Sequence, residues 1–175
     1  MQQEFYGKVQ DFIANLFGSS IFRNMVGKGT LACMRKFLKE IRLDEISKTD
    51  PSRYAETLDR LTEQFLQKMP VNDRRWGVAR KCLNLFFRDV LYNFYLRERY
   101  DFAKFESYLE IPLDSHVGEA LRSKCGGVDL PPWHTVKGLT KEESDKFQSA
   151  AAELAKSCET ERVHLDVVYW RGSPD

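Results

Sequence analysis

The 175-residue sequence lacks the cysteine patterns that bind metals. Its four cysteines, Cys33, Cys82, Cys125 and Cys158, are scattered along the chain and form no Cys-x-x-Cys pair and no cluster with histidine. This excludes the common zinc and iron–sulfur ligand patterns. Scattered thiols of this kind are usually reduced and buried. We therefore expect no metal site and no cofactor.

Long hydrophobic runs are absent as well. No stretch of apolar residues reaches the roughly 18 that a membrane-spanning helix needs, so no membrane span is expected. The first residues, Met-Gln-Gln-Glu-Phe-Tyr, lack the basic and apolar regions of a secretory signal. These absences predict a cytoplasmic protein.

The sequence also has no excess of charge of one sign. Its 27 lysines and arginines balance 26 acidic residues, and the net charge of +1 gives no general indication of nucleic-acid binding. One local cluster is basic and consists of Arg74, Arg75, Arg80 and Lys81. Such a cluster can form a basic face toward DNA, although the charges alone favour a solvated helix face.

What the sequence does contain is helical periodicity along most of its length. Apolar residues at Phe5, Val9, Phe12, Ile13 and Leu16 follow one helix face. Further helices are predicted over 31–41, over 54–69 after the cap and proline of Asp50-Pro51, and over 78–97, the most apolar and therefore central segment. Thr140 and Glu143 form a capping box that opens a helix to about residue 157, and a last helix covers about 162–170. No strand pattern occurs, so the fold class is all-α, in one compact unit.

Two short segments carry chemically useful residues. In the first, Gly77 precedes Lys81 and predicts a glycine turn whose backbone N–H groups can approach a phosphate. Lys81 then falls on the first turn of the central helix, where the positive end of the helix dipole disfavours an ammonium. A lysine nucleophile must be neutral to attack, so this position suits catalysis. Taken alone, the motif fits a solvated lysine at least as well.

The second segment, Ile111 to His116, places Asp114 between Pro112 and a new helix. This pattern is typical of an N-cap that accepts backbone N–H bonds. A carboxylate here can also stabilise a positively charged sugar and assist proton transfer. The two roles are compatible, because capping fixes the direction of the side chain.

The segments Gly77 to Phe87 and Ile111 to Val117 together resemble the core of the helix-hairpin-helix DNA glycosylase superfamily, and most closely its archaeal GO (8-oxoguanine) glycosylase branch. The resemblance implies that Lys81 is the nucleophile and Asp114 its carboxylate partner. A third segment, from His164 to Trp170, is similar to the C-terminal helix of that branch. There the resemblance implies that Asp166 and Trp170 contact a flipped base.

The resemblance covers about residues 74–171, while residues 1–73 form a helical part that matches nothing recognised. It implies a single domain over 1–175, two-lobed, with a helix-hairpin-helix motif and a cleft between the lobes. The hairpin residues Arg74, Arg75, Gly77 and Arg80 would bind the DNA backbone. Ala79 departs from the family pattern, since a second glycine is expected there.

The implied function is excision of a damaged base from double-stranded DNA, 8-oxoguanine first, by a monomer that associates with the nucleoid when bound to DNA. Whether a strand-nicking lyase step follows is left open. One alternative is a monofunctional glycosylase for a bulky modified base, such as a hypermodified phage cytosine, in which Asp114 activates water. The others are a non-catalytic helical DNA-binding module and a helical protein-interaction domain.

Overall fold

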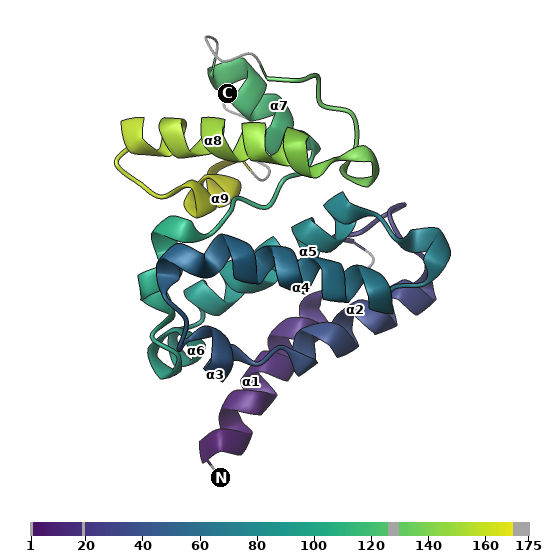
Figure 1. The fold of residues 1–175 in the computed structure, drawn as a ribbon, viewed down its shortest axis with the longest axis vertical. Coiled ribbons are helices and arrows are strands. Elements are labelled where there is room, and N and C mark those ends of the chain that lie inside the picture. The colour runs from purple at the N-terminus through teal and green to yellow at the C-terminus, as the bar shows by residue number, and fades with distance from the viewer. Residues whose placement is uncertain (1, 19, 126–129, 170–175) are drawn as a thin grey trace.

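The computed structural model describes residues 2–18, 20–125 and 130–169, and every regular element in these ranges is a helix (Figure 1). The prediction of an all-α fold is confirmed. The α-helices of the described part are α1 (Gln2–Leu16), α2 (Lys28–Glu40), α3 (Leu43–Ile46), α4 (Tyr54–Lys68), α5 (Trp76–Tyr92), α6 (Phe94–Arg99), α7 (Ser115–Lys124), α8 (Lys141–Ser157) and α9 (Leu165–Tyr169). Short 3-10 turns lie between them: η1 (Pro51–Arg53), η2 (Val71–Asp73), η3 (Phe102–Tyr108), η4 (Val136–Gly138) and η5 (Arg162–His164).

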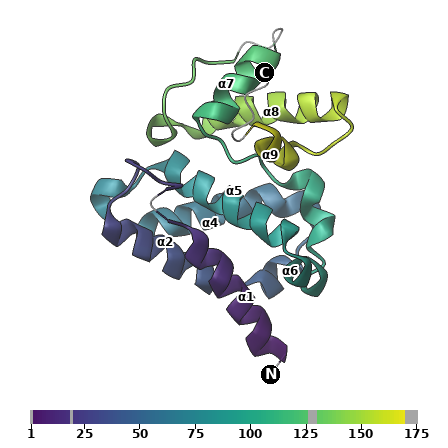
Figure 2. The same cartoon turned by 180° about the vertical axis from the view of Figure 1, so that it is seen from behind.

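The helices form two groups, with α1 to α6 in one and α7 to α9 in the other (Figure 1; Figure 2). Each group surrounds its own hydrophobic cluster, the larger one built mainly from α1, α2, α4 and α5. The smaller one is built from α7, α8, the start of α9 and the loop before α7. Helix α5 is central, because thirteen of its seventeen residues are buried. Every helix of the described residues is too short or too polar to cross a lipid bilayer.

Local capping signals placed several helix ends correctly. The side chain of Thr140 accepts a bond from the backbone N–H of Glu143, whose carboxylate accepts one from Thr140, and α8 runs to Ser157 as predicted. Asp50 accepts a bond from the backbone N–H of Ser52 at the start of η1, which leads into α4.

The prediction of a single helix over 78–97 is wrong, because the helix is interrupted at Asn93. This residue has an extended backbone, with φ −80° and ψ 111°. Its side chain accepts a bond from the backbone N–H of Leu96 at 3.1 Å and so begins α6 as a separate helix. An asparagine that caps the next helix competes with continuation of the preceding one.

The apolar stripe predicted for the first helix is only partly buried, because Ile13 lies in the core and Val9 packs against it. The side of α1 that packs on the molecule carries Gln10, Ile13 and Ala14, whereas Phe5, Phe12 and Leu16 are exposed. Gln10 is buried because its amide donates bonds to the carbonyls of Leu38 at 2.9 Å and of Ile41 at 3.0 Å, near the end of α2. A polar residue that satisfies two buried carbonyls can thus replace an apolar one on the core face.

Candidate active site

Lys81 and Asp114 meet between the two groups of helices. The Nζ of Lys81 on α5 lies 3.4 Å from an Oδ of Asp114, and the two side chains are 7% and 15% exposed. The sequence separates these residues by 33 positions, so their predicted convergence is confirmed. The separation is longer than the 2.7–2.9 Å or so of a tight charge-assisted hydrogen bond, so each group keeps capacity for a further partner.

Asp114 is held in place by its role as the N-cap of α7. Its backbone is extended, and its Oδ1 accepts a bond from the backbone N–H of Val117 at 3.1 Å. The other carboxylate oxygen, Oδ2, is the one that faces Lys81. The predicted cap is therefore confirmed, and it leaves one oxygen available to the amine.

The sequence predicted Lys81 on the first turn of its helix, and this is wrong. Helix α5 begins at Trp76, which places Lys81 in the second turn. The field of a helix dipole falls off within the first turn, so it contributes little at this position. The buried surroundings and the Asp114 carboxylate therefore define the environment of the amine.

Gly77 serves packing inside α5 and does not form a turn toward solvent. It is buried in the first turn of the helix, and a Cβ at this position would lie 2.2 Å from the carbonyl oxygen of Val136 and 2.8 Å from the Cβ of Leu139. The glycine thus lets η4 approach α5 closely. Because Gly77 is buried, the prediction that its backbone N–H approaches a phosphate is wrong. The reversal between α4 and α5 is made instead by η2.

Arg80 is not part of an exposed basic face either. The side chain is 3% exposed, and its guanidinium donates to both carboxylate oxygens of Glu110, at 2.8 and 2.7 Å. It also donates to Asp59 at 2.8 Å and to Thr62 at 3.1 Å. A guanidinium held in this way cannot reach a phosphate without breaking a buried ion pair. The prediction that Arg80 binds the DNA backbone is therefore wrong.

Arg74 and Arg75 are the exposed members of the basic cluster. The guanidinium of Arg74 donates to the carbonyls of Met69 at 3.0 Å and of Gln67 at 3.1 Å and so closes the C-terminal end of α4. Arg75 donates to the carbonyl of Arg74 at 2.9 Å and otherwise extends the surface beside the start of α5.

A second charged pair lies close to Lys81 and Asp114. Asp166, on α9, is buried and pairs with the guanidinium of Arg88, which also binds Asp89 at 2.8 Å. Burial raises the pKa of Asp166 from 3.8 to about 6, against the lowering effect of Arg88, while the negative charge of Asp114 raises the pKa further. The charge of the Asp114 carboxylate therefore affects the protonation of Asp166. Trp170, the other residue expected to contact the base, lies outside the described residues.

Arg88 was not among the residues expected at this site from the sequence. A local signal for it exists, because Arg88 follows Lys81 by seven residues, two turns along the same face of α5. A cation at that spacing from a proposed nucleophile is a candidate for the same site.

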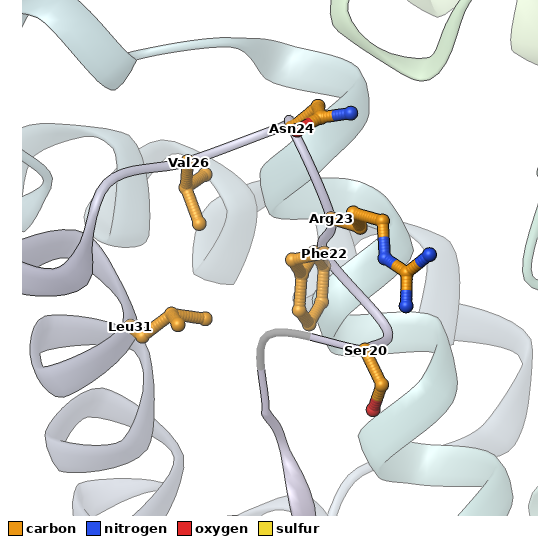
Figure 3. Close-up of a pocket in the computed structure, with 6 residues that line it drawn as sticks. All are labelled: Ser20, Phe22, Arg23, Asn24, Val26 and Leu31. Carbon is orange, nitrogen blue, oxygen red and sulfur yellow. The ribbon is translucent and has the colours of Figure 1, made fainter.

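The cavity at the turn between α1 and α2 is a separate feature. It has a volume of about 290 Å³ and is lined by Ser20, Phe22, Arg23, Asn24, Val26 and Leu31 (Figure 3). None of these residues belongs to the Lys81–Asp114 pair or to the Arg88–Asp166 pair. The cavity therefore does not identify a pocket for a base.

Comparisons with known proteins add no relative. No family model matches the chain, and no curated protein and no solved structure matches it significantly. The candidate site is therefore defined by the geometry described above, and its chemistry by the residues that the geometry brings together.

Proposed function

We propose that this chain is a DNA glycosylase that excises a damaged or modified base, in the first place 8-oxoguanine, with Lys81 as the nucleophile. The observation that carries the proposal is the placement of a buried amine 3.4 Å from a carboxylate fixed as a helix cap. The two groups come from segments far apart in the sequence. Removal from water favours the neutral amine that a lysine nucleophile needs. The carboxylate beside it can accept the proton that the ammonium must lose before it attacks.

In the proposed reaction, the neutral amine of Lys81 attacks C1′ of the flipped nucleotide. The bond from C1′ to the base breaks, and the base leaves with the bonding electron pair. The carboxylate of Asp114 stabilises the positive charge that develops on the sugar. The nitrogen then loses its proton and the C1′–O4′ bond breaks, with O4′ taking up a proton, so that a Schiff base joins Lys81 to C1′ of the opened sugar. Water hydrolyses this Schiff base, or it loses the C2′ proton and expels the 3′ phosphate, which nicks the strand.

The rest of the molecule would position the DNA. We propose that α4, η2 and α5 form the helix-hairpin-helix element, with Arg75, and with Arg74 at its edge, toward the backbone. A cleft between the two groups of helices would admit the flipped base, whose edge Asp166 would contact. Trp170 remains our proposed stacking partner. Unstacking costs a few kcal/mol and costs least at damaged or mispaired bases, which favours such substrates.

Borohydride trapping on duplexes that carry a panel of modified bases tests this proposal. Released base and nicked strand are scored separately for the wild type and for Lys81→Gln, with Lys156→Gln, an exposed lysine on α8, as the matched control. We expect the wild type and the control to be trapped on the DNA and Lys81→Gln to lose trapping. Trapping that persists in Lys81→Gln would place the nucleophile elsewhere.

The pairing of Lys81 with Asp114 also favours a second candidate, a monofunctional glycosylase. An ammonium held by a carboxylate cannot attack, but it can stabilise charge while Asp114 activates a water. The target would then be a bulky modified base, and the assay would give released base and abasic sites without trapping or nicks. If no base is released and Asp114→Asn leaves DNA affinity unchanged, the chain is a non-catalytic DNA-binding module.

A further inference from the structure

Helix α1 carries an apolar face that the other described residues leave largely exposed. Phe5, Phe12 and Leu16 are 44%, 63% and 54% exposed, and Val9 lies between them, partly buried. These four residues are spaced by four, three and four positions. This is the alternation of the d and a positions of a coiled coil, on a side of α1 that adjoins the face packed on the core, which Val9 also contacts.

The apolar face continues onto α6. The ring of Tyr95 packs edge-on against Phe5, with centroids 5.2 Å apart, and Phe94 packs edge-on against Tyr95 at 5.6 Å. We call these six residues, Phe5, Val9, Phe12, Leu16, Phe94 and Tyr95, the α1 patch. From their exposed fractions, the patch presents roughly 500 Å² of apolar surface. The N-terminal part of α1 extends beyond the other helices, so a second helix can approach it (Figure 1; Figure 2).

We propose that the occupant of the α1 patch is a second copy of this chain, docked with the two α1 helices antiparallel. The spacing of the patch is self-complementary in this arrangement. Phe5 faces Leu16 of the second copy, and Val9 faces Phe12 of the second copy, so each apolar residue meets an apolar residue in both directions. This is the condition for a two-fold symmetric interface, in which the same surface patch serves both copies.

The area of the patch limits the size of this interface. Two copies together bury about 1,000 Å², which is near the lower limit of specific protein interfaces. We therefore expect a reversible dimer. The sequence analysis led us to expect a monomer instead.

The edge of the patch provides a test of the register. Lys8 and Asn15 flank the stripe on one side of α1, and both are exposed. In the antiparallel register these positions face each other across the interface, so that Lys8 lies beside Asn15 of the second copy. A charge introduced at position 15 therefore meets a lysine in the dimer but not in the monomer.

Sedimentation equilibrium of the full chain from low to high micromolar concentration tests the proposal. We expect the wild type to dimerise and Phe12→Ser to weaken dimerisation roughly tenfold. The matched control Val71→Ser removes an exposed apolar side chain outside the patch and leaves the equilibrium unchanged. Asn15→Glu should tighten the dimer and Asn15→Lys should loosen it, each by about threefold. Circular dichroism checks that every variant is folded.

Three outcomes overturn the proposal. A wild type that stays monomeric at all concentrations removes the second copy as the occupant. A dimer that is insensitive to Phe12→Ser uses a different surface. If Asn15→Glu and Asn15→Lys act alike, the helices do not pair in the antiparallel register.

Discussion

Replacing Arg80 with alanine should destabilise the fold by about 3–5 kcal/mol, because it leaves a buried charge without its partner. The guanidinium donates two bonds to Glu110, which is 8% exposed. Among the described residues, the variant would leave that carboxylate with the amide of Asn84, at 2.9 Å, as its hydrogen-bond donor. The bond to Asp59 counts for less, since this carboxylate is substantially exposed and water can replace the arginine. For a chain of this length, the loss corresponds to a decrease of roughly 10 °C in the melting temperature.

Urea unfolding of Arg80→Ala beside Arg75→Ala measures the effect. Arg75 is exposed, so its replacement should change the free energy of unfolding by less than about 0.5 kcal/mol. If the chain binds DNA as proposed, Arg75→Ala should weaken binding and lower the salt slope by about one. Under conditions where both variants are folded, Arg80→Ala should keep its DNA affinity. An Arg80→Ala protein with wild-type stability and reduced DNA affinity would refute the assignment of Arg80 to the core.

Two further perturbations test the site and its packing. Because the folded state raises the pKa of Asp166 from 3.8 to about 6, the folded state holds this proton more tightly than the unfolded chain, and the free energy of unfolding should fall as pH rises between these values. In urea titrations, the Asp166→Asn variant should not show this fall in the free energy of unfolding with pH. The proposed base release should decrease below about pH 6 in the wild type but not in Asp166→Asn. Gly77→Ala should destabilise by about 1–3 kcal/mol, because the new Cβ meets a backbone carbonyl at 2.2 Å. Gly7→Ala, with open space around its Cβ, should instead stabilise α1 by up to about 1 kcal/mol in thermal unfolding.

The parts of the fold that the sequence predicted are those with local causes. The capping box of Thr140 and Glu143 acts within four residues and predicted the start of α8. The period of the apolar residues that follow predicted its length. Asp114 was predicted as a cap for the same reason. The convergence of Lys81 with Asp114 is different, because it was expected from the family resemblance and not from any local pattern.

The misplaced residues depend on partners that are distant in the sequence. Arg75 and Arg80 look alike in the basic cluster, yet Arg80 is buried because Glu110, 30 residues later, neutralises it. Gln10 takes a core position on α1, outside the predicted apolar stripe, because its amide satisfies carbonyls of Leu38 and Ile41 in a separate segment. In both cases a polar group becomes a core residue only through a long-range hydrogen bond, which periodicity cannot reveal.

The same long-range pairs explain why charge counting misjudges the proposed DNA-binding surface. Three cations of α5 turn inward to carboxylates: Arg80 to Glu110, Lys81 to Asp114 and Arg88 to Asp166. These pairs tie α5 to the segments that follow it and remove positive charge from the surface. Of the basic cluster, Arg75 is then the residue best placed to contact a phosphate, because Arg74 closes the end of α4. The proposed enzyme should therefore depend on salt less steeply than its arginine and lysine content suggests, and recognition of the flipped base must supply more of its specificity.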